Sequence, residues 1–257
     1  MHRVRALQAR LLPHGPWDVV RQVLLFFLAY NGYRLVRGMA DDPGVTAVAF
    51  EHARALIGME RSLHIFVEPS IQGWATSTHV MADGASWLYL NAQTSVTLGS
   101  LAFLYLFHNS SFYYVRNMFM VAMAIALVGY VLYPTAPPRF LPEWGFTDTV
   151  ANFTGVGHDN TTVNALFNPY AAVPSMHTCF ALMIGVPLSR LVRNRVGKVF
   201  WGLYPLIVVF VIVATGNHFF TDAFLGGCTA AVSAYAASWL ARARPAAWAF
   251  SHSGVPA

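Results

Sequence analysis

Charged side chains are scarce in this sequence. Only 11% of its 257 residues are Asp, Glu, Lys or Arg, whereas 56% are hydrophobic and the mean hydropathy is +0.48. Soluble domains carry about a quarter charged residues, so this chain has too few to cover an ordinary water-exposed surface. The composition therefore excludes a typical soluble globular protein and indicates an integral membrane protein.

Cysteines and linker sequences are also scarce. The two cysteines, Cys179 and Cys228, both lie inside apolar segments, where cysteine behaves as a small core residue. Their number and spacing exclude a disulfide framework and a cysteine-based metal centre. Because no Gly-rich or Pro-rich linker and no repeat divides the sequence, we expect a single domain over residues 1–257.

Long hydrophobic segments, by contrast, are abundant. Six of them can cross a bilayer as helices, over residues 17–36, 85–107, 112–133, 174–191, 199–215 and 218–240. The first segment could be a secretory signal peptide, but no small-residue cleavage site follows it, and we interpret it as a retained span. The predicted fold is an all-α, six-transmembrane-helix bundle.

A different pattern lies between the first two spans. Over residues 49–66, apolar side chains recur on one helical face, while Glu51, Arg54 and Arg61 lie elsewhere. This pattern predicts an amphipathic helix on the membrane surface. A helix that packs on a soluble face of the protein would give nearly the same pattern.

The basic residues predict the sidedness of the bundle. The net charge of +5 would suggest nucleic acid as a partner of a soluble protein, but here the basic residues cluster at the ends of the hydrophobic segments, so we expect no nucleic-acid partner. With the N-terminus inside, the inner segments hold Arg3, Arg5, Arg10, Arg116, Arg190, Arg193, Arg195, Lys198, Arg242 and Arg244. The outer connection 134–172 holds only Arg139. This asymmetry follows the positive-inside rule, although the arginines between residues 34 and 61 would lie outside.

Polar residues from three distant segments meet at the outer side of this topology. Arg139 follows the third span, His177 begins the fourth, and His218 and Asp222 begin the sixth. Since His218 and Asp222 are four residues apart, the carboxylate can fix the imidazole tautomer and leave the other nitrogen as a nucleophile. His177 can then act as a general acid, and the guanidinium of Arg139 matches phosphate oxygens.

The stretch YAAVPSMHTCF (170–180) marks where the fourth span begins. Pro174 suits a first helical turn, and Ser175 together with the free amides of that turn would cradle an anion. A lone histidine at such a position is more often a packing residue than a catalytic one. The joint occurrence of His177 with the other polar groups predicts phosphoryl transfer through a phosphohistidine.

Three motifs carry a family resemblance. The segments PTAPPR (134–139), PSMH (174–177) and NHFFTD (217–222) resemble the motifs of the type 2 phosphatidic acid phosphatase superfamily. The pattern is most similar to the branch that contains fungal inositol phosphorylceramide synthase and its bacterial relatives, for which ERSLHIFVEPSIQGW (60–74) is typical. The resemblance implies a six-helix membrane bundle with core motifs at 134–222, an active site at the extracytoplasmic face of a bacterial cell membrane, and no metal or other cofactor.

The resemblance also implies a role for each motif residue. His218 is the expected nucleophile, Asp222 its partner and His177 the acid, while phosphate is bound by Arg139, Ser175 and Asn217.

The chain departs from the broad family at three positions. Leu132 and Ile212 stand where that family has a Lys and an Arg, and Met176 replaces a Gly in the second motif. Two phosphate-binding cations are thereby missing. We expect Arg34, Arg37 or Arg61 to compensate.

The predicted function is the cleavage of a lipid phosphate or pyrophosphate, with water as acceptor, or the transfer of an inositol phosphate-type headgroup to a polyol or sugar. Two other classes stay open: a metal-dependent hydrolase with His177, His218 and Asp222 as ligands, and a non-catalytic lipid-binding or transport bundle. His158 and Asp159 are interpreted as solvated loop residues.

Overall fold

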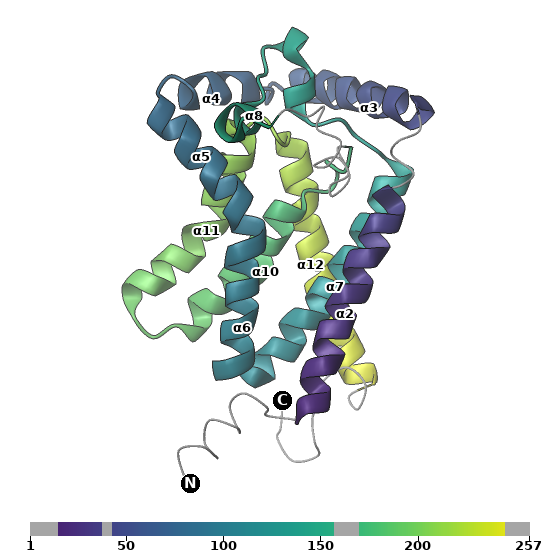
Figure 1. The fold of residues 1–257 in the computed structure, drawn as a ribbon, viewed down its shortest axis with the longest axis vertical. Helices are drawn as coiled ribbons and strands as arrows, with labels where there is room; N and C mark the ends of the chain where they lie inside the picture. The colour runs from purple at the N-terminus through teal and green to yellow at the C-terminus, as the bar shows by residue number, and fades with distance from the viewer. Residues whose placement is uncertain (1–14, 38–42, 157–169, 245–257) are drawn as a thin grey trace.

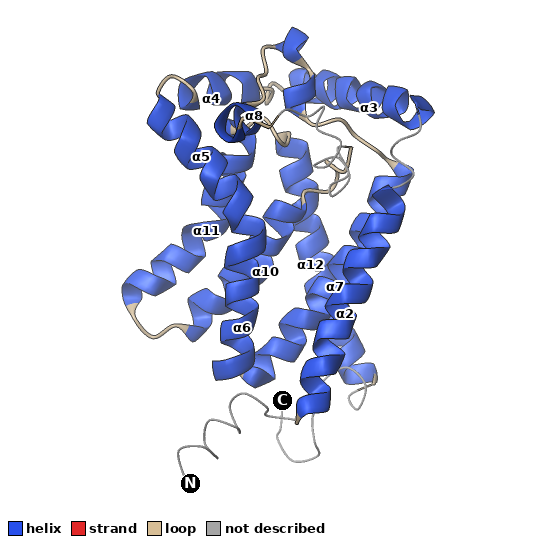
Figure 2. Cartoon of the chain, in the orientation of Figure 1, coloured by secondary structure: helices blue, strands red, loops and turns tan. Residues whose placement is uncertain are grey.

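The computed structural model describes residues 15–37, 43–156 and 170–244 (Figure 1). Within these ranges the chain is helical and forms no strand (Figure 2); its extended segments meet at a parallel β-bridge between Thr135 and Ala171. In chain order, the helices are α2 (Pro16–Arg37), α3 (Pro43–Ser62), α4 (Glu68–Ala75), α5 (His79–Asn91), the π-helix η1 (Ala92–Val96), α6 (Thr97–Phe107), α7 (Asn109–Leu132), the 3-10 helices η2 (Pro138–Phe140) and η3 (Pro142–Trp144), α8 (Thr149–Thr154), α10 (Met176–Leu191), α11 (Arg195–Ala214) and α12 (Phe220–Ala243).

Three of the described helices, α7, α11 and α12, are long and apolar enough to cross a membrane, and α10 is a shorter apolar helix. Large hydrophobic side chains remain exposed on the outside of the bundle, among them Leu206 on α11 and Phe224 on α12, at 66% and 71% exposure. A soluble monomer does not leave apolar surface of this extent uncovered. The fold is therefore that of an all-helical integral membrane protein, and the count of six spans stays a prediction.

Helix α10 lies at the centre of the bundle and contacts α6, α7, α11 and α12. Its close approach to α11 depends on Gly185, because a Cβ atom there would lie 2.7 Å from the carbonyl oxygen of Trp201. Helices α5, η1 and α6 follow one another along one side of α10, and α2 packs on α7 (Figure 1). The predicted second span, 85–107, is thus divided among α5, η1 and α6, and its first helix begins before that range, at His79.

Helix α3 lies across one end of the bundle, close to α4 and α8 (Figure 1). Its apolar face, with Ala53, Leu56 and Ile57, packs against a cluster that includes Leu141 and Phe219. The amphipathic pattern is therefore explained by packing on the protein itself, which is the second of the two interpretations of that pattern. The position of α3 relative to a bilayer stays a prediction.

The described part of the connection 134–172 contains η2, η3 and α8. The amide of Ala136 donates to the Ala49 carbonyl at 3.0 Å, and the amide of Arg139 donates to the Gly216 carbonyl at 2.7 Å. These bonds fix the first motif between α3 and the end of α11. His158 and Asp159 lie outside the described residues.

Candidate active site

The turn between α11 and α12 positions His218 and Asp222. Gly216 adopts a φ of +66°, and the amides of Asn217 and His218 both donate to the Ile212 carbonyl, at 2.9 and 3.2 Å. His218 Nδ1 lies 3.3 Å from Asp222 Oδ2, which also accepts from the Phe219 amide at 3.0 Å. Since Nδ1 faces the carboxylate, Nε2 is the nitrogen left for chemistry.

The start of α10 lies against this turn. Ser175 is the N-cap, and its oxygen accepts from the Thr178 amide at 3.5 Å. Helix α10 begins at Met176, so Pro174 precedes the cap and does not lie in the first turn as predicted. The Ser175 amide donates to the Asp222 carbonyl at 3.0 Å, which ties the second motif to the third.

The two histidines face each other across this junction. Their ring centroids are 5.5 Å apart, and the half-buried His177 ring also stacks on Tyr89 of α5, at 4.5 Å and 24°. An atom bound between the rings would be within reach of both imidazoles. Tyr89 is a neighbour that the sequence did not single out, because a tyrosine in an apolar span carries no local signal of such a contact.

Arg139 completes the group from the first motif. Its Nη1 donates to Asn217 Oδ1, and its Nε lies 3.6 Å from Asp148 Oδ2. The side-chain nitrogen of Asn217 donates to Thr215 Oγ1 at 2.8 Å. Asn217 therefore connects the turn between α11 and α12 to the guanidinium of Arg139. Asn217 thus orients Arg139, a geometry that differs from the direct phosphate contact we expect of it.

Electrostatics favour a neutral imidazole at His218. Burial and, to a smaller extent, the positive charge of Arg139 lower the pKa of His218 to about 3, although the Ala172 carbonyl partly offsets the effect. A neutral ring at physiological pH is the form that can attack phosphorus. The structure thus brings Arg139, Ser175, His177, Asn217, His218 and Asp222 together, while their catalytic and binding roles stay predictions.

Two glutamates that the sequence did not single out bind the first turn of α12. Glu68 Oε1 accepts from the Phe220 amide at 3.0 Å, and Glu60 Oε1 accepts from the Thr221 amide at 2.8 Å and its hydroxyl at 2.7 Å. Both glutamates are fully buried. One signal was available for Glu60: it shares the apolar face of α3 with Ala53 and Ile57, where a carboxylate needs a partner.

Of the three arginines expected to replace the missing cations, only Arg61 has a described side chain. Arg61 is exposed and lies over the ring of Trp144, at 5.5 Å. The side chains of Arg34 and Arg37 lie outside the described part of the chain. Among the described side chains, no group of three or more His, Cys, Asp or Glu residues could hold a metal ion.

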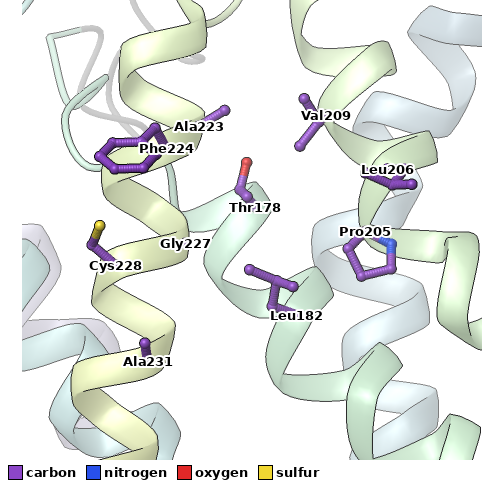
Figure 3. Close-up of a pocket in the computed structure, with 10 residues that line it drawn as sticks. All are labelled: Thr178, Leu182, Pro205, Leu206, Val209, Ala223, Phe224, Gly227, Cys228 and Ala231. Atoms are coloured by element: carbon purple, nitrogen blue, oxygen red, sulfur yellow. The ribbon is translucent and has the colours of Figure 1, made fainter.

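An apolar groove of about 360 Å³ runs between α10, α11 and α12 (Figure 3). Thr178 contributes a hydroxyl at one end, and Leu182, Val209 and Phe224 contribute hydrophobic walls. None of the predicted site residues lines it. The groove is therefore separate from the polar junction between the histidines.

Comparison with known proteins gives two findings. A sequence model of the PAP2 superfamily matches residues 54–237, which include all three motifs. The chain is also similar to the phosphoinositol dihydroceramide synthase of Bacteroides thetaiotaomicron, with 27% identity over 127 residues; the alignment covers 42% of this chain and 40% of that protein. No solved structure matches.

Proposed function

The chain belongs to the PAP2 superfamily, and we propose on that premise that it transfers the phosphate-bearing headgroup of a membrane lipid through a phosphohistidine on His218. The observation that carries the proposal is the pairing of His218 Nδ1 with Asp222 at 3.3 Å while the His177 ring lies 5.5 Å from that of His218. This arrangement supplies a nucleophile, its orienting carboxylate and an acid at one place.

The chemistry proceeds in two steps. His218 Nε2 attacks phosphorus, the ester bond to the lipid alcohol breaks, and protonated His177 gives its proton to the leaving oxygen. An acceptor hydroxyl or water then attacks phosphorus, the P–N bond breaks, and the proton of the acceptor passes to His177. Arg139 stabilises the charge on the phosphate oxygens in both steps.

The name of the similar protein, phosphoinositol dihydroceramide synthase, supports an alcohol as the acceptor. We propose an alcohol acceptor, with an inositol phosphate-type headgroup as the transferred group and hydrolysis by water as the competing outcome. The absence of the two family cations at Leu132 and Ile212 is in keeping with a phosphodiester substrate, which carries less charge than a phosphomonoester.

The topology belongs to the same proposal. We propose a single domain with six spans, in which the consecutive helices α5, η1 and α6 together form one span and the others are α2, α7, α10, α11 and α12. The junction of α10 and α12 then lies at the extracytoplasmic face of a bacterial cell membrane, with α3 at its interface. The basic residues at the opposite end, including Arg190 and Arg195, support this orientation.

The test is a reconstitution with a defined donor. Purified protein in mixed micelles receives radiolabelled phosphatidylinositol, with and without ceramide or another alcohol, and the products are separated. We expect a new headgroup-bearing lipid with the acceptor present, and an acid-labile phosphoenzyme after rapid denaturation. His218→Ala should abolish both, whereas His79→Ala, at an exposed histidine near the same end, should leave both unchanged. Turnover by His218→Ala would contradict the mechanism.

The two other classes predict different results. A metal-dependent hydrolase would lose activity to a chelator and resist vanadate, an analogue of the phosphoryl transition state. A non-catalytic lipid carrier would release no product, and His177→Ala would leave its lipid binding unchanged.

A further inference from the structure

Two buried carboxyl groups hold the turn that carries His218. Glu60 on α3 and Glu68 on α4 are both 0% exposed, and they accept hydrogen bonds from the adjacent amides of Thr221 and Phe220. These amides belong to the first turn of α12, where backbone N–H groups lack helical partners. The Oε2 atoms of both glutamates have no hydrogen-bond partner among the described residues.

Two ionised carboxylates in this position would be strongly unfavourable. Burial alone disfavours each charge, and two like charges side by side repel each other. A single proton placed between the two free Oε2 atoms removes one charge and gives both oxygens a partner. The amide hydrogen bonds and the positive end of the α12 dipole then stabilise the charge that remains.

We propose that Glu60 and Glu68 share one proton and act together as positioning residues, which hold the α12 turn so that His218 faces His177. This inference rests on the proposed phosphoryl transfer at His218, and it extends the site to the segment 60–74, which precedes the third motif by more than half the chain.

The electrostatic surroundings of the pair agree with a retained proton. Burial and the neighbouring Glu60 carboxyl together raise the pKa of Glu68 to about 8, although the hydrogen bond from the Phe220 amide acts in the opposite direction. From α12, Asp222 adds a further carboxyl near Glu60. Helix α5, which packs on α4, brings His79 and Asp83, but both are exposed.

The other helix packed on α4 brings no compensating charge. Helix α11 has its titratable side chains in its first half, at Arg195, Lys198 and Tyr204, whereas its last residues lead into the His218 turn. No cation is among the groups that shift the pKa of Glu68, and the pair depends on its shared proton to avoid a second negative charge. Above pH 8 the pair loses that proton, and the repulsion acts on the first turn of α12.

The experiment compares three variants of the full chain in the phosphatidylinositol assay from pH 5 to 10. In Glu68→Gln, the amide oxygen accepts from Phe220 and the amide NH₂ donates to Glu60, which imitates the protonated pair at every pH. Glu68→Ala removes both contacts. Glu51→Gln changes an exposed glutamate on α3 in the same way and is the matched control.

We expect kcat of the wild type and of Glu51→Gln to fall above pH 8, and the fall to be absent in Glu68→Gln. Glu68→Ala should lower kcat on the order of 100-fold, because the nucleophile is misplaced, with KM changed much less; Glu68→Gln should recover most of this loss. An alkaline fall at the same pH in Glu68→Gln, or equal losses in Gln and Ala, would overturn the proposal.

A second measurement separates this proposal from the enzymatic one. Because the pKa of Glu68 is raised from its ordinary 4.5 to about 8, its contribution to stability is complete below pH 4.5 and is lost as the pH rises to 8. Thermal unfolding in detergent should therefore show Glu68→Gln gaining stability relative to the wild type between pH 5 and 8. A constant difference would overturn the shared proton, even if no substrate were turned over. A rising difference without any turnover would overturn the proposed function alone.

Discussion

At the scale of single residues, Arg139 acts on the candidate site in two separable ways. Its planar guanidinium contacts Asn217 and Asp148, and in the proposed mechanism it binds the phosphate oxygens. Its charge also contributes to the lowered pKa of His218. The first effect needs the shape of the side chain, and the second needs only its charge.

Two substitutions at Arg139 should therefore differ in their pH dependence. Arg139→Lys keeps the positive charge but loses the planar donor geometry of the guanidinium, so we expect kcat/KM to fall about 10-fold. The acid limb of the pH profile of phosphoenzyme formation should stay at the same pH. Arg139→Gln loses both, so the pKa of His218 should rise toward its ordinary value and the acid limb should move to higher pH. The pH profile of phosphoenzyme formation checks this. An unmoved limb in Arg139→Gln would show that Arg139 does not act on the nucleophile.

A contact in the site can be predicted from the sequence when its two residues are close together along the chain. The pair His218 and Asp222 is local, and the contact predicted from their spacing is present. The predicted helix is wrong for one partner, because α12 begins at Phe220 and His218 lies in the turn before it. Glu60 and Thr221 are 161 residues apart, and no periodicity connects them. Only the anomaly of a carboxylate on an apolar helix face pointed to such a partner.

At the scale of elements, the junction of α10 and α12 depends on the absence of a side chain at Gly226. A Cβ atom there would collide with the carbonyl oxygen of Ser175 and approach Thr178 at 3.2 Å. The neighbouring Gly227 is different, because its Cβ would meet only a Leu182 methyl group at 3.7 Å. Small residues at helix crossings allow such close backbone approach.

This contrast predicts unequal effects of two neighbouring substitutions. Gly226→Ala should destabilise the protein by about 1–3 kcal/mol and lower kcat, because the N-cap Ser175 and its bond to Asp222 must shift. Gly227→Ala should leave both quantities near the wild-type values. Thermal unfolding and steady-state kinetics measure the two effects, and equal behaviour of the two variants would contradict the packing argument.

The boundaries of the elements were predictable where a local signal marks them. Ser175 caps α10 within the predicted motif, and the apolar run that ends at Leu132 ends α7. No element is predicted between residues 66 and 85, where the short helix α4 buries Gln72, whose side chain bonds to the backbone of Thr147 in a distant loop. Tertiary contacts of this kind override local propensity.

At the scale of the whole molecule, two polar ends are separated by an apolar middle. At the end of the bundle away from the candidate site, Asp18 of α2 accepts from the hydroxyls of Tyr105 and Tyr113, at 3.1 and 2.6 Å, and buried Arg116 donates to Gln22 at 2.8 Å. Apolar residues of α7 and α10 fill the space between the two ends. This division fits a molecule whose middle lies in lipid.

The orientation of this molecule in the membrane gives the last prediction. Ser77, between α4 and α5, and Val196, at the start of α11, are both exposed. The turn before α11 lies on the side of the bundle, well away from α4 and the first turn of α5 (Figure 1). If the candidate site faces outward, a membrane-impermeant maleimide should label Ser77→Cys on intact cells and Val196→Cys only after permeabilisation. The native cysteines should give a low background, because Cys179 is buried and Cys228, although exposed, lines the apolar groove on α12, which would lie in lipid. The wild-type protein measures that background directly. Labelling of Val196→Cys alone on intact cells would reverse the orientation and place the candidate site on the cytoplasmic side.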